Sequence, residues 1–306
     1  MFEVLLTNRN GCCREKYVGF IWPALDESTD RERKHAFVVA GYLARQRDWT
    51  EAERKWMLRL DKEEIKYFSS SECMSLSGEF KRFRDNDKYP RPEGRLAANK
   101  IRDDLLEIMK KEQVAGFALG LRLKEHRAMQ KSSRARKVLP PDPYENMYTM
   151  MMIVIVGELE DEYRAGLFPA RETVAFLCDA HDKSVNIKNL YDELKRHNPG
   201  CAPWMGSLSY MDNEQSPALQ AADMLASQCK DVLVEETTKP PGKRPLGDTF
   251  KQRVGGHVSL RVFDMATLKM LVDANLPRKG KPGIYSTQQL TMFKDTVLAK
   301  NGDKNR

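Results

Sequence analysis

Tyr17-Val-Gly-Phe-Ile-Trp-Pro-Ala-Leu25 is an apolar run that leads directly into Asp26-Glu27-Ser-Thr. A second apolar run, Ala36-Phe-Val-Val-Ala-Gly-Tyr-Leu43, follows after a charged stretch. Two such runs joined by a polar turn predict an antiparallel hairpin. The hairpin would hold the two acids at the tip of a buried strand, at the edge of a sheet where a ligand can reach them.

Downstream of the hairpin, the patterns typical of helices and strands alternate. Apolar residues that recur at three- to five-residue steps predict helices, and short apolar runs predict buried strands. A hairpin followed by such alternation predicts an α/β fold, with a mixed sheet and helices on its faces. The expected elements are a helix from Trp49 capped by Thr50, a short strand 64–68, a helix 93–112, a strand 114–123, a helix 144–164, a strand 173–178, a helix 186–196, a strand 205–211 and a helix 217–233.

The composition changes beyond Glu236, where Lys239-Pro-Pro-Gly-Lys-Arg-Pro has the character of a linker. Residues 257–274 have weak helical character, and the charged tail from Lys294 shows no clear pattern. We therefore predict an α/β domain over residues 1–235 and a partly helical C-terminal extension over residues 236–306.

Composition narrows the class of protein only moderately. The 306 residues are 41% hydrophobic, enough for a sizeable core, and a net charge of +7 suits a polyanionic partner without requiring one. The six cysteines form no CxxC pair and no zinc-like spacing. No signal peptide is evident, and the longest apolar run, Met150–Val156, is far short of the roughly 20 residues that span a bilayer. These features predict a cytoplasmic protein without membrane contact.

Two further acids accompany the predicted hairpin. Asp179 ends the predicted strand Thr173–Cys178, and Asp223 lies in the predicted helix that contains Gln220-Ala-Ala-Asp223. Acids that converge from two strand ends and a helix suit hard divalent cations, which take oxygen ligands. The alternative for each acid taken alone is ordinary turn or helix-start chemistry, in which short polar side chains bond local backbone groups.

These motifs resemble a large bacterial family known as domain of unknown function 3800. Its marks are an Asp-Glu pair at the end of the first strand and a Gln-x-x-Asp in a late helix, here Asp26-Glu27 and Gln220–Asp223. The resemblance covers about residues 17–233, and Asp179 is similar to the family's third acidic position. It implies a ribonuclease-H-like mixed sheet with acids at its centre. It leaves open which of Glu27, Glu158 and Asp182 is the counterpart of the glutamate usual in ribonuclease-H-like enzymes.

The resemblance supplies no demonstrated activity, and from the acids themselves we predict two-metal hydrolysis of a phosphodiester. Asp26 would bridge two Mg²⁺ or Mn²⁺ ions, with Asp179 and Asp223 each completing one site, so that the ions activate water and stabilise the leaving oxygen. Gln220 would orient a carboxylate or contact substrate, or else satisfy buried backbone groups. His181 would assist proton transfer or bind phosphate, or else be an ordinary loop residue. Glu27 is included among the candidate catalytic residues.

The expected partner is a nucleic acid, DNA or RNA. Residues Lys124–Lys137 contain six Lys and Arg side chains and one Glu, which favours contact with a phosphate backbone. The alternative is a solvated loop. Two other functions compete with a nuclease: a nucleic-acid- or partner-binding protein that retains the fold without the chemistry, and a hydrolase of a small phosphorylated metabolite.

Overall fold

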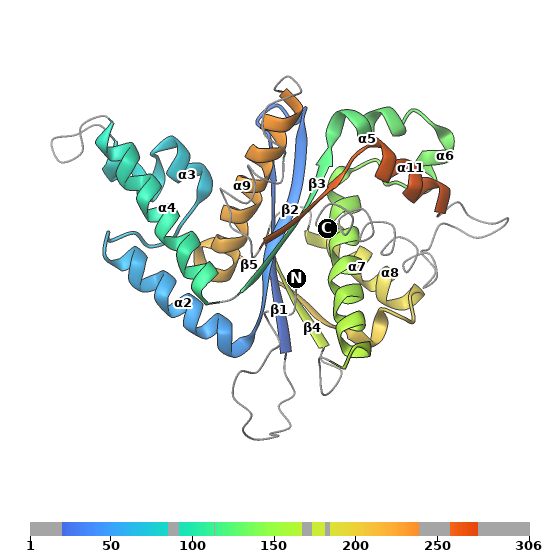
Figure 1. Cartoon of the computed structure of the whole chain (residues 1–306), viewed down its shortest axis with the longest axis horizontal. Helices are drawn as coiled ribbons and strands as arrows, with labels where there is room; N and C mark the ends of the chain where they lie inside the picture. The colour runs from blue at the N-terminus through green and yellow to red at the C-terminus, as the bar shows by residue number, and fades with distance from the viewer. Residues whose placement is uncertain are drawn as a thin grey trace, which may run out of the picture.

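The computed structural model describes residues 20–84, 92–112, 114–166, 173–180, 184–238 and 258–274. These residues form a mixed β-sheet with helices packed on both faces, so the predicted α/β class is confirmed (Figure 1). None of the described helices is long and apolar enough to cross a membrane. The predicted linker after Glu236 and the tail from Lys294 lie outside the described residues.

The sheet has six strands in the order β5-β4-β1-β2-β3-β6. Only β2 runs antiparallel to its neighbours, because β1 pairs parallel to β4, β4 to β5, and β3 to β6. The carboxyl ends of five strands therefore point the same way, and β1 lies in the interior of the sheet. The strands are β1 Phe20–Thr29, β2 Ala36–Arg45, β3 Ala115–Arg122, β4 Thr173–Asp179, β5 Met205–Met211 and β6 Val258–Phe263.

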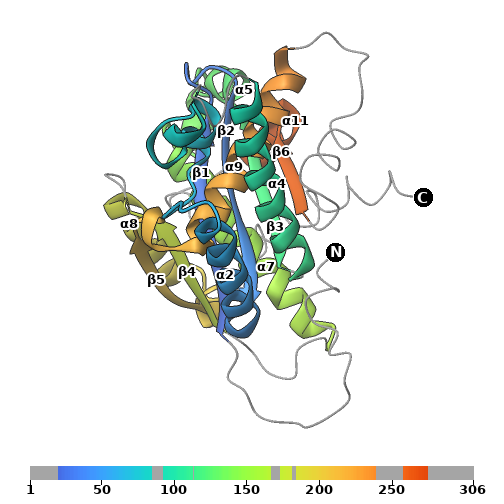
Figure 2. The same cartoon turned by 90° about the vertical axis from the view of Figure 1, so that its left-hand side faces the viewer.

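The helices lie in two groups on opposite faces of the sheet (Figures 1 and 2). On one face α9 packs directly on β1 and β2, and α2 and α4 lie outside it. On the other face α7 is the central helix, with α8 beside it. The first group is α2 Gln46–Asp61, α3 Ser70–Ser75, α4 Glu93–Lys111 and α9 Pro217–Thr238; the second is α5 Leu123–Met129, α6 Ser133–Arg136, α7 Pro143–Arg164, α8 Ser184–His197 and α11 Met265–Ala274.

The sheet separates two apolar cores because successive side chains of a strand point to opposite faces. In β1, Leu25 packs into the core beneath α7, whereas its neighbour Ala24 packs into the core beneath α9. Strand β2 is buried along nearly its whole length. Its Gly41 pairs with Leu25, and a Cβ atom at Gly41 would lie 1.9 Å from the Ala24 carbonyl oxygen, so this close approach requires glycine.

The predicted hairpin is confirmed, but its strands are longer than expected. Strand β1 continues through the acids, since Asp26 pairs with Ala40 and Thr29 with Phe37. The turn is shortened to residues 30–35, where the Asp30 carboxylate accepts hydrogen bonds from the backbone N–H groups of residues 34–36. Asp26 and Glu27 thus lie inside a paired strand rather than in the turn after it.

Two local predictions near the hairpin are wrong. Residues 64–68 do not form a strand: Ile65 and Phe68 are buried, and Phe68 packs edge-on against Trp56 with ring centroids 6.1 Å apart. The apolar side chains of this segment are buried by packing against helices, so the segment does not pair in the sheet. Helix α2 begins at Gln46, so Thr50 is not its cap; the Thr50 hydroxyl donates to the Gln46 carbonyl within the helix.

The C-terminal residues also differ from their predicted helical character. Residues 258–263 form β6, which pairs parallel to β3, and helix α11 begins only at Met265. Val258 and Phe263 at the two ends of β6 are buried in the two opposite cores, and the four residues between them are half-buried, as suits a strand at the edge of a sheet. Residues 258–274 lie in the predicted C-terminal extension, and their strand is nevertheless the sixth strand of this sheet.

Candidate acidic site

Three aspartates from different elements share the face of the sheet that α9 covers. Asp26 follows Ala24 on this face of β1. In β4, Val174, Phe176 and Cys178 pack into the opposite core, so the alternation directs Asp179 toward the α9 face. Because Leu25 pairs with Cys178, the next residues, Asp26 and Asp179, lie side by side on adjacent strands. Asp223 is the third member, on α9 above them.

The three carboxylates destabilise one another's charged forms. Asp26 is 5% exposed. Burial first, and then the charges of Asp223, Glu27 and Asp179, raise its pKa well above the usual range, while a hydrogen bond from the Glu27 backbone lowers it. Burial and the charge of Asp179 raise the pKa of Asp223 to about 6, although hydrogen bonds from Ser70 and the charge of Lys230 lower it. The site therefore concentrates negative charge around the buried Asp26, while Asp179 and Asp223 are half-buried.

A backbone N–H group fixes one oxygen of each aspartate. The Glu27 N–H donates to Asp26 Oδ1 at 2.7 Å, and the Asn213 N–H donates to Asp179 Oδ1 at 3.1 Å. The Ser70 N–H donates to Asp223 Oδ2 at 2.7 Å. Since an ionised carboxylate offers about four acceptor positions, each of these bonds orients its side chain and leaves capacity for a further ligand.

Gln220 connects the segments that carry two of these donors. Its Oε1 accepts from Trp56 Nε1 at 2.9 Å and from the Phe68 N–H at 3.0 Å. Its Nε2 donates to the carbonyl oxygens of Asn213 at 3.0 Å and Glu214 at 3.3 Å. Gln220 is 1% exposed. Of the two predicted roles, the structure shows the satisfaction of buried backbone groups, and this amide links the chain around Ser70 to the turn after β5.

Glu27 lies on the opposite face from the three aspartates. Leu25, two residues earlier on β1, and Val39, which pairs with Glu27 on β2, both belong to the core beneath α7. Its Oε2 accepts a 2.6 Å hydrogen bond from the hydroxyl of buried Tyr148 on α7. Burial, and then the charge of Glu27, raises the pKa of Tyr148 well above its usual range. The adjacent acids of the Asp26-Glu27 motif thus serve two different polar environments.

The remaining predicted residues contribute no further acid to this face in the described structure. His181 lies outside the described residues, as does Asp182. Glu158 on α7 forms an ion pair with Arg261 of β6 at 2.5 Å, at the other end of the sheet from β4. The sequence patterns did not indicate Ser70 and Asn213, because Asn213 contributes its backbone N–H and a lone serine such as Ser70 has no distinctive sequence pattern.

The donor set at this site consists of hard oxygen atoms, which suit Mg²⁺ or Mn²⁺. A divalent cation would also relieve the repulsion that raises the pKa values of Asp26 and Asp223. Across the described residues, however, no group of three His, Cys, Asp or Glu side chains has the arrangement of a ready metal site. The chemistry of the aspartates fits a cation, and their present arrangement requires side-chain adjustment to hold one.

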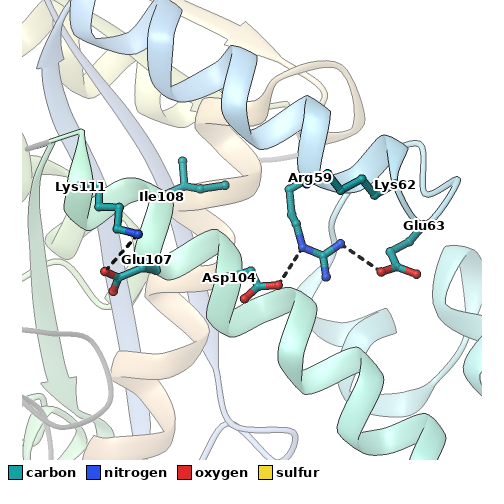
Figure 3. A pocket seen from close by; sticks show the side chains of 7 residues that line it. All are labelled: Arg59, Lys62, Glu63, Asp104, Glu107, Ile108 and Lys111. Carbon is teal, nitrogen blue, oxygen red and sulfur yellow. Dashed lines mark hydrogen bonds and ion pairs between the residues drawn. The ribbon is translucent and has the colours of Figure 1, made fainter.

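A separate pocket of about 460 Å³ lies between α2 and α4 (Figure 3). Its charges are largely paired within it: Arg59 contacts Asp104 at 2.9 Å and Glu63 at 3.2 Å. Paired surface charges of this kind have little capacity left for a ligand. None of the three aspartates lines this pocket, whose residues are Arg59, Lys62, Glu63, Asp104, Glu107, Ile108 and Lys111.

Comparison with known proteins does not assign this site. No family model, no curated protein and no solved structure matches the chain. The chemistry of the aspartates on the sheet is therefore the basis for the functional interpretation.

Proposed function

We propose that the chain is a divalent-metal-dependent phosphodiester hydrolase that acts on nucleic acid. The observation that carries this proposal is the set of Asp26, Asp179 and Asp223 on one face of the sheet, with the pKa of Asp26 raised by burial and by the charges of the other acids. A cluster of this kind gives no benefit to the fold, since buried like charges destabilise it. Cation binding accounts for its presence.

Each aspartate has a definite part in the proposed reaction. Asp26, Asp179 and Asp223 would hold Mg²⁺ or Mn²⁺, which supplies an activated water and stabilises the leaving oxygen when bound. Asp26 is held by its pairing with Ala40 of β2, directly after Leu25, the last residue of β1 that is paired on both sides. The N–H groups of Ser70 and Asn213 keep Asp223 and Asp179 oriented. Gln220 acts as a positioning residue that holds both donor segments in place.

We also propose that the fold is ribonuclease-H-like and that the chain is related to domain of unknown function 3800. A mixed sheet with acids on its central strands supports both parts of this proposal. The Asp26-Glu27 and Gln220–Asp223 motifs lie on one strand and one helix that pack against each other, which also supports them.

The experiment that tests the proposal measures cleavage of labelled DNA and RNA with Mn²⁺, Mg²⁺ or EDTA. Wild type is compared with Asp26→Asn and Asp223→Asn, and with Asp61→Asn, an exposed acid at the end of α2, as the matched control. We expect metal-dependent cleavage that the first two substitutions abolish and the control retains. Cleavage that survives in Asp26→Asn and Asp223→Asn would show that this site is not the catalytic centre.

A further inference from the structure

The β1–β2 hairpin projects beyond the end of β4. Strand β1 pairs with β2 as far as Thr29, but its pairing with β4 ends at Leu25. In the described part of the chain, residues 26–29 therefore have no strand partner on the β4 side. Asp26 lies at this step in the sheet, and the tip of the hairpin lies about 13 Å further along β1, at about 3.3 Å for each residue to Asp30.

The tip of the hairpin is a fixed turn with basic side chains directed outward. The Asp30 carboxylate holds the backbone of the turn through three N–H groups. Arg31, Arg33 and Lys34 are all exposed. Arg33 has φ of 51°, a left-handed conformation that glycine adopts at much lower cost.

Helix α5 extends this basic surface along the same end of the sheet (Figure 1). The Leu123 N–H donates to the His35 carbonyl at 3.0 Å, and the Arg127 guanidinium donates to the Arg33 carbonyl. The residues predicted to form a basic connector thus form two short helices, the first of which is joined to the hairpin tip. We call the exposed side chains of Arg31, Arg33, Lys34, Lys124, Arg127 and Lys131 the basic ledge.

The acids near the basic ledge are already engaged. Glu32 pairs with Lys34 at 2.5 Å, and Glu125 pairs with Arg122 at 3.3 Å. For Arg31, Arg33 and Lys124, by contrast, no ion pair occurs with any acid in the described residues. Exposed cations without acidic partners on a fixed surface are suited to the phosphates of a polyanion.

We infer that the basic ledge binds the phosphate backbone of a nucleic acid strand at the end of the sheet where β1 carries Asp26. The inference rests on the proposed function and names the surface that holds its nucleic acid substrate. A small phosphorylated metabolite cannot contact both the hairpin tip and Asp26 across about 13 Å of strand. The side chains of the basic ledge would contact phosphates of the nucleic acid and not its bases, so binding will be insensitive to base sequence.

The test is fluorescence anisotropy of labelled single- and double-stranded oligonucleotides, in EDTA, over a range of salt concentrations. The ledge variant is Arg31→Ser/Arg33→Gly/Lys124→Ser. The control variant, Lys62→Ser/Lys110→Ser/Lys111→Ser, removes the same charge from α2 and α4, on the far helical layer. Each phosphate contact contributes about 0.7–0.9 to the slope of log affinity against log salt. We expect the ledge variant to bind about tenfold or more weakly and to lose about 2–3 from that slope.

The ledge variant should remain as stable as wild type, because its three side chains are exposed and Arg33→Gly removes a strained conformation. Equal affinity of the ledge variant and wild type, equal weakening by the control variant, or no binding by wild type would each overturn the inference. Binding in EDTA requires neither metal nor cleavage. Loss of binding in the ledge variant without any cleavage by wild type would therefore retain the ledge and reject the proposed hydrolase.

Discussion

Gln220 and Asp223 lie one helical turn apart on α9 and bond to the same short segment of chain, Gln220 to the Phe68 N–H and Asp223 to the Ser70 N–H. The other end of the Gln220 amide bonds to Asn213, whose N–H donates to Asp179. The spacing of the Gln-x-x-Asp motif therefore follows from helix geometry, since residues three apart share a face. Gln220 holds the chain segment in place, and Asp223 is oriented by a hydrogen bond from that same segment.

Replacement of Gln220 should disturb two aspartates at once. Gln220→Met has a similar volume but leaves the buried Trp56 and Phe68 N–H groups without their acceptor, and each such group costs about 1–3 kcal/mol; the two carbonyl groups that also lose their partner lie in a part-exposed turn. We expect a loss of roughly 2–4 kcal/mol in the free energy of unfolding, measured by denaturant titration. Gln228→Met on the same helix, half-buried, is the control, and it should lose less than 1 kcal/mol or so.

The supporting role of Gln220 has a second readout. Because the amide holds the donors to Asp179 and Asp223, Gln220→Met should also weaken Mn²⁺ binding at temperatures where the variant is fully folded. A variant that is destabilised but binds Mn²⁺ like wild type would show that Gln220 serves the core alone.

Asp223→Asn should stabilise the metal-free protein at neutral pH while it abolishes cleavage. The pKa of Asp223 is raised from 3.8 to about 6 in the folded state, so the folded state binds the proton more tightly than the unfolded chain. Stability from this group is fully present below about pH 3.8 and is lost as the pH rises through about 6. The gain in Asp223→Asn should thus appear over this window and reach about 1–3 kcal/mol above it.

Thermal unfolding in EDTA at pH 4 and pH 8 measures this difference. Asn keeps an oxygen that can accept from the Ser70 N–H, so the substitution removes the charge without removing the bond. A melting temperature for Asp223→Asn below that of wild type at pH 8 would contradict the electrostatic description of the site.

Asp26 and Glu27 should respond differently to the same chemical change. Asp26→Asn removes a carboxylate from the face of the aspartates, whereas Glu27→Gln acts on the face where Tyr148 donates to Glu27. We expect Asp26→Asn to lower the cleavage rate by about 10²-fold or more, equivalent to about 2.7 kcal/mol, and Glu27→Gln to lower it by less than about tenfold. Single-turnover cleavage with Mn²⁺ provides the comparison. Equal losses would place Glu27 in the reaction itself.

Binding of Mg²⁺ should release a proton near neutral pH. Because the pKa of Asp223 is raised to about 6, part of the metal-free protein carries a proton on this group near pH 6, and a cation displaces that proton from its ligand. Calorimetric titration in two buffers with different heats of ionisation measures the protons released. We expect release at pH 6–7 that decreases toward pH 8. Binding without proton release throughout this range would show that the aspartates are not the ligands.

The sequence predicts the strands and helices that have strong periodicity, but not their arrangement. The hairpin, α4, α7, α8 and α9 follow local apolar patterns, and the structure confirms them. The parallel pairing of β1 with β4 brings Asp26 beside Asp179 from more than a hundred residues away, and nothing local specifies it. Residues 64–68 and 258–263 differ from what their local pattern predicts, because short segments take the structure that their distant neighbours allow.

The sequence predicts the acids of the site, but it does not predict the groups that hold them by hydrogen bonds. Carboxylates at strand ends have a recognisable pattern, so Asp26, Asp179 and Asp223 stand out in the sequence. The opposite orientation of Glu27 follows from the two-residue period of a strand once β1 is known to continue past Asp26. The partners of Gln220 lie up to 164 residues away, and such contacts exist only in the folded chain.

Mn²⁺ binding, followed by electron paramagnetic resonance of the free ion, tests the central claim most directly. Wild type is titrated beside Asp26→Asn, Asp179→Asn, Asp223→Asn and the exposed control Asp61→Asn. The account predicts saturable binding in wild type and in the control, with affinity at least about tenfold lower in each of the other three variants. Equal Mn²⁺ affinity in all five proteins, or none in wild type, would contradict it.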